Sequence, residues 1–311
     1  MATLSQYLFV TGALLLLLAF ILAVAYTTLL AVGQRARATA AGGMPQLATA
    51  GPVGATPGVA PSVTATGTPL PGAATVAAIG HGLTWASFLL MGGSLLARAV
   101  IVERGPWGNM YEFSIAFAVG ILGGYLFLQR RYPIGSIAFL PLGVALFLVG
   151  YAATLPAAIE PLVPALDNPP LLTVHVAMAM IAYGVLAISF AAAVGYLLQG
   201  EEDRFSWLPG HKVLDEVAYR SVIIGFPIFA TMLILGSYWA SVAWGRYWGW
   251  DPKETSALVT WLIYALYLHA RSRKDWAGRP AALILVIGFG AVLFTYFGNL
   301  FFSGLHSYSG L

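Results

Sequence analysis

The chain has 311 residues, of which 59% are hydrophobic and only 9% are charged, and its formal net charge at pH 7 is +3. A soluble domain carries about 25% charged residues, so this composition excludes a water-facing globular surface. The chain has no cysteine, which excludes thiol–disulfide exchange and iron–sulfur ligation. The small net charge gives no reason to expect nucleic acid as a partner.

Long apolar stretches recur along the sequence, and each can cross a hydrocarbon core about 30 Å thick. Such segments are helices, because no water is available there to pair with backbone amides. We therefore expect an all-α polytopic membrane protein, embedded in a lipid bilayer, with about eight transmembrane helices. In chain order these cover residues 8–32, 75–98, 109–128, 134–153, 171–199, 217–241, 253–270 and 280–302.

The basic residues are distributed unevenly between the two sides of this topology. Eleven fall on one side: Arg35, Arg37, Arg130, Arg131, Arg204, Lys212, Arg220, Arg271, Arg273, Lys274 and Arg279. The other four, Arg98, Arg104, Arg246 and Lys253, fall on the opposite side. Basic residues favour the cytoplasmic side, so both termini are predicted to face the outer, periplasmic side. The Ala/Gly/Arg-rich usage favours a bacterial plasma membrane over a thylakoid membrane.

Residues 38–73 form a low-complexity run of Ala, Gly, Pro, Thr and Val without any charge. A segment of this composition cannot bury a core and is typical of a flexible linker. We therefore expect an N-terminal transmembrane helix within residues 1–37, a cytoplasmic linker, and a membrane domain over residues 74–311. In this interpretation the first helix is only loosely attached to the remainder.

The segment Trp244-Gly-Arg-Tyr-Trp-Gly-Trp-Asp-Pro-Lys-Glu254 contains a helix-start pattern. Asp251 suits an N-cap, Pro252 suits the first helical position, and Glu254 suits the carboxylate of a capping box. The seventh helix is therefore predicted to begin here, on the outer side, with the positive end of its dipole facing the loop.

The same region gathers aromatic side chains: Trp239, Trp244, Tyr247, Trp248 and Trp250. Rigid aromatic faces suit a large planar ligand. The basic residues Arg246 and Lys253, together with the helix N-terminus, suit carboxylates of such a ligand. An interfacial belt of Trp and Tyr is the alternative interpretation.

Four histidines are candidates for binding a metal. His175 lies near the outer end of the fifth predicted helix, and His306 lies just past the last one. Two imidazoles from different helices on one membrane face can bind one iron from opposite sides. His269 ends the seventh helix on the cytoplasmic side, and His81 lies in the cytoplasmic half of the second. Ionisable residues within membrane segments are functional candidates, although a histidine near an interface is also commonly structural.

Several segments resemble one known family. Trp244 to Glu254 is similar to the tryptophan-rich WWD signature of the haem-handling superfamily that includes CcsA (ResC), CcmC and CcmF. Four others resemble motifs of the CcsA branch: Asn109-Met-Tyr-Glu-Phe113, Trp261-Leu-Ile-Tyr-Ala-Leu-Tyr-Leu-His-Ala-Arg271, Phe294-Thr-Tyr-Phe-Gly298 and Gly304-Leu-His-Ser-Tyr308. The resemblance covers about residues 76–308. It makes residues 74–311 a cytochrome c assembly domain with its WWD loop at 239–254.

The resemblance implies the haem-handling subunit of a System II cytochrome c synthetase, with non-covalently bound haem b as cargo. His175 and His306 correspond to the outer iron ligands, and the aromatic loop with Asp251 corresponds to the haem platform. His269 corresponds to an intramembrane ligand. Its opposite ligand is expected from a CcsB (ResB) type membrane partner, with His81 as a local substitute. Haem would be presented to the CxxCH segment of apocytochrome c, and catalysis would be positional, without an acid or nucleophile.

Three other functions compete with this interpretation. A haem transporter of the CcmC kind would bind haem without attaching it, but residues 294–308 favour the CcsA branch. A quinone- or ion-coupled subunit would need carboxylates within the spans, whereas nearly all twelve acidic residues lie at span ends or in loops. A structural scaffold would not need the aromatic loop.

Overall fold

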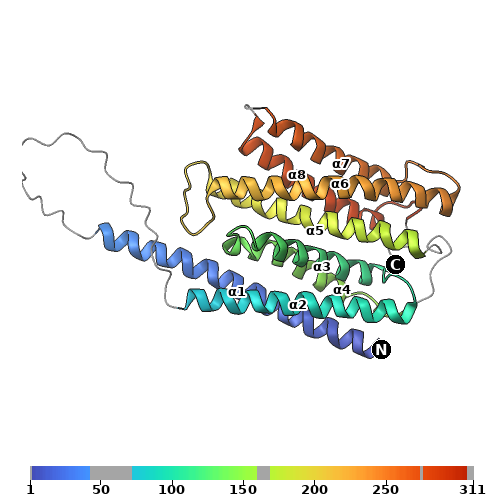
Figure 1. Ribbon diagram of the computed structural model, residues 1–311, viewed down its shortest axis with the longest axis horizontal. Helices are drawn as coiled ribbons and strands as arrows, with labels where there is room; N and C mark the ends of the chain where they lie inside the picture. Colours follow the sequence, from blue (N-terminus) through green and yellow to red (C-terminus); the bar gives the residue numbers. More distant parts are fainter. Residues whose placement is uncertain (1, 43–71, 160–168, 274–275, 307–311) are drawn as a thin grey trace, which may run out of the picture.

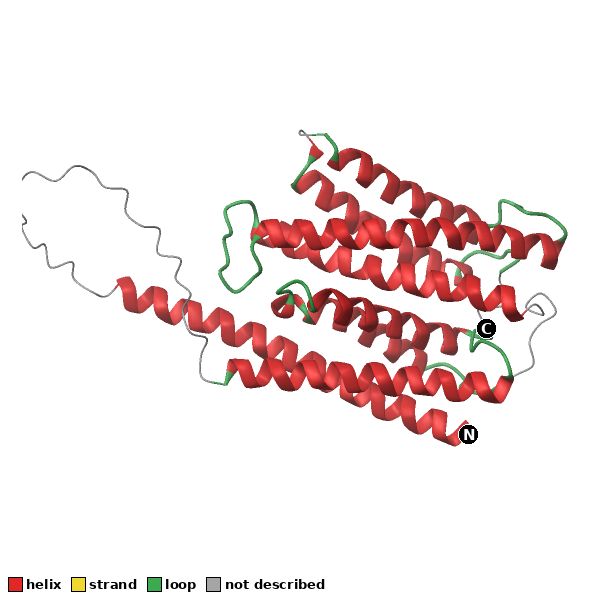
Figure 2. Ribbon diagram, in the orientation of Figure 1, coloured by secondary structure: helices red, strands yellow, loops and turns green. Residues whose placement is uncertain are grey.

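The computed structural model describes residues 2–42, 72–159, 169–273 and 276–306, which fold as helices joined by short loops (Figures 1 and 2). The α-helices are α1 (Ala2–Gly42), α2 (Ala73–Val102), α3 (Met110–Gln129), α4 (Phe139–Ala153), α5 (Pro169–Gln199), α6 (His211–Trp244), α7 (Pro252–Arg271) and α8 (Arg279–Phe297). Two 3-10 turns, η1 (Gly135–Ile137) and η4 (Gly298–Leu300), precede α4 and follow α8.

The chain is a multi-span membrane protein, as its composition predicts. Over the described residues, seven helices are long and apolar enough to cross a membrane. The exception is α7, because charged and hydroxyl-bearing residues occupy its ends. It nevertheless lies beside α6 and α8 within the same bundle (Figure 1). The predicted all-helical polytopic fold is therefore confirmed, with α7 less apolar than its neighbours.

The helices run side by side along the length of the molecule (Figure 1). The α1–α2 pair lies on one flank and α6, α7 and α8 lie on the other, with α3, α4 and α5 between them. Glycines let α3 and α5 cross closely, since a Cβ at Gly120 would lie 2.5 Å from the carbonyl oxygen of Met180. Gly184 faces Gly120 across the same crossing. Small residues allow such close approach in membrane proteins, and this contact fixes the spacing of the two helices.

The first helix is packed onto the bundle, so the expectation of a loose attachment is wrong. The hydroxyl of Ser94 on α2 donates a hydrogen bond of 2.8 Å to the carbonyl of Ser5 on α1, and Leu16 is fully buried. Residues 38–42 of the predicted linker continue α1, while residues 43–71 lie outside the described residues. The composition of a linker does not report how the helix before it packs.

The two ends of the bundle carry different connections (Figure 1). The α2–α3 and α6–α7 connections and the segment after α8 lie at one end, and the α3–α4 and α5–α6 connections lie at the other. The first end holds the loops that the charge pattern assigns to the periplasm. We refer to it as the outer end.

This assignment predicts the accessibility of single cysteines, which the native chain lacks. Tyr247→Cys at the outer end should react with a membrane-impermeant maleimide in intact spheroplasts. Ser272→Cys, after α7, should react only after permeabilisation, because the positive-inside rule places its basic surroundings in the cytoplasm. Phe301→Cys, also exposed at the outer end, is the matched control and should label like Tyr247→Cys. Labelling of Tyr247→Cys and Ser272→Cys from one side would contradict the orientation.

Candidate functional site

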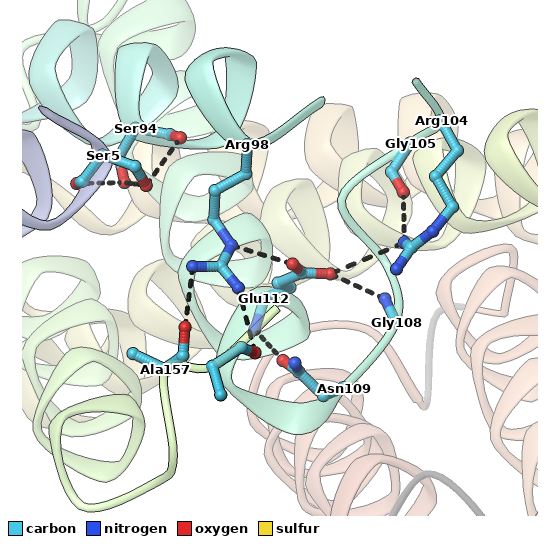
Figure 3. Close-up of polar contacts among 10 residues, drawn as sticks. Ser5, Ser94, Arg98, Arg104, Gly105, Gly108, Asn109, Glu112 and Ala157 are labelled. Carbon is cyan, nitrogen blue, oxygen red and sulfur yellow. Dashed lines mark hydrogen bonds and ion pairs between the residues drawn. The ribbon is translucent and has the colours of Figure 1, made fainter. Parts of the chain in front are cut away.

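A buried polar network fixes the start of α3 at the outer end (Figure 3). Arg98 and Glu112 are each only 1% exposed, and the Arg98 Nε donates to Glu112 Oε1 at 2.8 Å. The Arg98 Nη1 also donates to the Ala157 carbonyl at 3.0 Å, which ties in the segment after α4. Asn109 caps α3 by accepting a hydrogen bond from the Glu112 amide at 3.0 Å. The network holds the first turn of α3 against its neighbours.

Beside this network, a cavity lies among α3, α5, α6, α7, α8 and the segment after α8. It contains about 1000 Å³ of unfilled space, a figure that includes space open to solvent. Its lining residues are Met110, Phe113, Leu172, His175, Val176, Ala179, Met180, Tyr183, Met232, Leu233, Gly236, Ser237, Trp239, Trp248, Lys253, Glu254, Ala257, Thr295, Tyr296 and His306. The walls are mainly apolar and aromatic, with two imidazoles, one ammonium and one carboxylate among them.

His175 enters the cavity from α5 with a fixed ring orientation. Its Nδ1 lies 2.9 Å from the carbonyl oxygen of Met232, and its ring is stacked near that of Trp239, with centroids 6.4 Å apart and an interplanar angle of 13°. Gly236 makes room for the ring, because a Cβ there would lie 2.6 Å from the imidazole Cε1. Since a carbonyl only accepts, Nδ1 carries the proton and Nε2 carries the lone pair.

His306 reaches the same cavity from the segment after α8. Its Nδ1 lies 2.8 Å from Oδ2 of Asp251, and its ring centroid is 5.8 Å from that of Trp239 and 4.9 Å from that of Trp244. Burial lowers the pKa of the His306 imidazole, and the contact with Asp251 offsets this only in part. At neutral pH the imidazole is therefore neutral, with its proton on Nδ1 facing the carboxylate.

Asp251 joins the N-terminus of α7 to the segment after α8. Its side chain caps α7 by accepting from the Lys253 amide at 3.0 Å, and Glu254 completes the predicted capping box, which is confirmed. Its Oδ1 also accepts from the Leu305 amide at 2.5 Å. Burial by itself raises the pKa of Asp251, but the hydrogen bonds from His306, Lys253 and Leu305 outweigh it and lower the pKa to about 2. Asp251 is thus an ionised carboxylate at neutral pH.

Only some of the five aromatic residues of the predicted platform line the cavity. Trp239, 3% exposed, and Trp248 line the cavity, whereas Trp244 packs edge-on against Trp239 with centroids 4.7 Å apart. Tyr247 is 63% exposed and Trp250 is 70% exposed, and neither lines the cavity. Trp250 also has a φ of 55°, in the left-handed region that favours glycine.

The two basic residues predicted to meet carboxylates are also separated. Lys253 lines the cavity, whereas Arg246 is exposed on the loop and is absent from the lining. The structure also contains a buried hydrogen-bond donor that was not predicted from the sequence. Within the described part of the chain, the buried indole N–H of Trp239 has no hydrogen-bond acceptor. Of these groups, the Lys253 ammonium in the cavity wall is the one that suits an anionic ligand group.

The remaining candidate histidines lie elsewhere. His81 has its Nδ1 3.0 Å from Gln129 Oε1, and its Nε2 accepts from the Trp85 indole at 3.2 Å. It lines a second cavity of about 340 Å³ formed by α1, α2, α3, α4 and η1, to which α7 contributes no residue. His269 is exposed near the end of α7. The structure therefore does not bring His81 and His269 to one cavity.

Much of the cavity wall was not identified from the sequence. Helical spacing could have found part of it: Ala179 and Tyr183 follow His175 by four and eight residues on α5. On α6, Gly236 precedes Trp239 by three residues and so shares its helix face. The contributions of α3 and α8, such as Met110, Phe113 and Tyr296, depend on how distant helices pack, which local spacing does not report.

Known proteins resemble this chain over most of its length. Residues 107–306 match the family model described as cytochrome c assembly protein. The cytochrome c biogenesis protein CcsA of Guillardia theta is 33% identical over 260 residues, which cover 75% of this chain and 86% of that one. CcsA of Prochlorococcus marinus is 35% identical over 251 residues (71% and 81%), and CcsA of Synechococcus elongatus is 33% identical over 296 residues (78% and 91%).

Among solved structures, cytochrome c heme lyase CcmF superposes with a TM-score of 0.65 at 17% identity, covering 95% of this chain and 46% of the CcmF chain. That likeness shows a shared fold over about half of CcmF. The family match begins just before α3 and ends at His306, and so spans every element that lines the larger cavity. By the family match and the extent of identity to its relatives, the chain belongs to the cytochrome c assembly protein family.

Proposed function

We propose that this chain is the haem-handling subunit of a System II type cytochrome c synthetase. In this proposal it binds haem b non-covalently at the outer membrane face and presents it to the CxxCH segment of apocytochrome c. One observation carries the proposal. His175 and His306 come from different elements to one aromatic-lined cavity, and each ring has its Nδ1 engaged so that Nε2 is the ligating nitrogen.

The residues of the cavity suit this cargo. Two neutral imidazoles would fill both axial positions of the iron, which blocks oxygen chemistry. Trp239 and Trp248 supply aromatic surface, while the Lys253 ammonium suits a propionate. Each thioether forms when a cysteine S–H adds across a vinyl group, with sulfur bonding to one vinyl carbon and the proton going to the other. Holding porphyrin and peptide in one orientation raises their effective concentration, so the contribution of the protein is positional.

We further propose that the protein works in a bacterial plasma membrane with a CcsB-type partner, which supplies the ligand opposite His269. The exposure of His269 on α7 supports a ligand from another chain, since its side chain remains accessible there. His81 is less suitable as that ligand, because both of its ring nitrogens form hydrogen bonds with Gln129 and Trp85.

A reporter assay separates a synthetase from a haem transporter of the CcmC kind. Cells would make this protein, a CcsB-type partner and an apocytochrome, and covalently attached haem would be read by haem stain on a denaturing gel. His269→Ala should reduce attachment by starving the outer site, and added haem or imidazole should partly restore it. Trp248→Ala damages the cavity itself, so added haem should help little. Trp276→Ala, which removes an exposed tryptophan at the other end, should behave like the native protein.

Two outcomes would count against the proposal. If the pair attaches no haem covalently while haem accumulates at the outer face, the protein is a transporter. If His269→Ala and Trp248→Ala respond equally to added haem, the scheme of an inner delivery position and an outer attachment position is wrong.

A further inference from the structure

The two imidazoles in the cavity donate to chemically different acceptors. His306 faces the carboxylate of Asp251 at 2.8 Å, whereas His175 faces the neutral backbone carbonyl of Met232 at 2.9 Å. A hydrogen bond to an ionised acceptor is roughly twice as strong as one between neutral groups. The two rings are therefore polarised to different extents, although the distances are nearly equal.

We propose that Asp251 is a positioning residue that makes His306 the stronger, more electron-donating of two unequal axial ligands. This inference rests on the haem site proposed above. A carboxylate that accepts the Nδ1 proton increases electron density at Nε2, which strengthens the bond from Nε2 to a metal. A backbone carbonyl does so less, so His175 is the weaker ligand.

The surroundings of Asp251 support this role. Its carboxylate is held in one orientation by the amides of Lys253 and Leu305, and it is only 6% exposed, so little solvent weakens its field at His306. Gly304 completes the arrangement, because a Cβ at that position would collide with the carboxylate. The segment that carries His306 can approach Asp251 closely only because residue 304 has no side chain.

As a platform residue, Asp251 was expected to contact haem directly. The geometry does not favour such a contact. Asp251 is absent from the cavity lining, and both of its carboxylate oxygens accept hydrogen bonds within the chain. Its influence on a ligand in the cavity therefore passes through the imidazole of His306.

Vibrational spectroscopy of the purified haem-loaded protein tests the inequality. In His175→Ala the iron is left with His306, and in His306→Ala it is left with His175. Resonance Raman spectra of the five-coordinate ferrous state, made by photolysis of the CO adduct, should show a higher iron–histidine stretching frequency in His175→Ala. Adding Asp251→Asn to His175→Ala should lower that frequency to near the value for His306→Ala. In the protein with both histidines, Asp251→Asn should raise the midpoint potential of the iron.

Glu216→Gln is the control, because it neutralises an exposed carboxylate that pairs with Arg220, does not line the cavity and leaves the Asp251–His306 contact in place. It should not change the iron–histidine frequency. Equal frequencies in the two single-histidine variants would overturn the inference, and that comparison stands even if Asp251→Asn fails to fold. An unchanged frequency in haem-loaded Asp251→Asn would overturn it as well. By contrast, full haem binding after loss of both histidines would contradict the haem site itself.

Discussion

Replacing His175 and His306 together by alanine is expected to remove haem from the outer cavity of the purified protein. Both imidazole side chains line one cavity, each with its Nδ1 engaged, and no other described histidine lines it. Loss of groups that merely support a metal ligand already weakens binding about 10- to 100-fold, so each single variant should lose at least about tenfold in haem affinity. Soret absorbance per protein, with a pyridine haemochrome assay, measures the loss. Added imidazole should partly restore each single variant by filling the vacated position.

Gly236 lies beside His175, and its substitution is expected to reduce haem retention less than loss of His175 does. Gly236→Ala places a methyl group against the imidazole, so it should lower haem retention without removing the ligand. Gly290→Ala, on α8, adds the same methyl group where nothing lies within 4 Å, and haem retention should be unchanged. Native haem content and an unchanged spectrum in the double histidine variant would refute the assignment of these ligands.

Glu112→Gln is expected to cause the largest loss of stability among single charge-neutralising changes at the outer end. The change leaves the guanidinium of Arg98 buried without its carboxylate partner (Figure 3). Breaking a buried ion pair from one side costs about 3–5 kcal/mol, because the remaining charge is uncompensated. The loss should appear as a lower thermal unfolding midpoint in detergent, and haem retention should fall too, since α3 forms one wall of the cavity.

Two comparisons isolate the buried charge as the cause. Removing both partners in Arg98→Met/Glu112→Leu should recover part of the loss, because no charge is then left uncompensated. Glu216→Gln breaks a pair with Arg220 at an exposed position, where water screens the two charges and the pair contributes little to stability. A midpoint for Glu112→Gln no lower than that for Glu216→Gln would show that the buried network contributes little.

The parts of the fold that follow from local chemistry were predictable. Apolar segments of sufficient length identified the helices, and the spacing of Asp251, Pro252 and Glu254 identified the start of α7, because a capping box involves only neighbouring residues. The predicted eighth span was too long. The observed helix α8 ends at Phe297 and is followed by η4. The chain then reaches the N-terminus of α7. That approach depends on a contact between residues 251 and 305, which no local pattern contains.

The site was predictable to the level of helix ends, but not of side-chain direction. The sequence placed His175 and His306 toward one face, and the structure brings both to one cavity. It could not predict that Tyr247 and Trp250 are exposed, because an aromatic residue in a loop has no helical phase to orient it. The pairing of Arg98 with Glu112 depended similarly on the packing of α2 against α3.

The left-handed backbone of Trp250 destabilises the fold at an exposed residue of the aromatic loop. A left-handed conformation costs a non-glycine residue about 1–2 kcal/mol, and the exposed indole recovers little of this by burial. Glycine would relieve that cost and would also delete the most exposed tryptophan of the aromatic loop. A variant library sorted only for resistance to detergent or heat would therefore enrich glycine at this position. Under the proposed function, such a library would also have to be selected for haem attachment, because selection for stability alone does not retain the tryptophan.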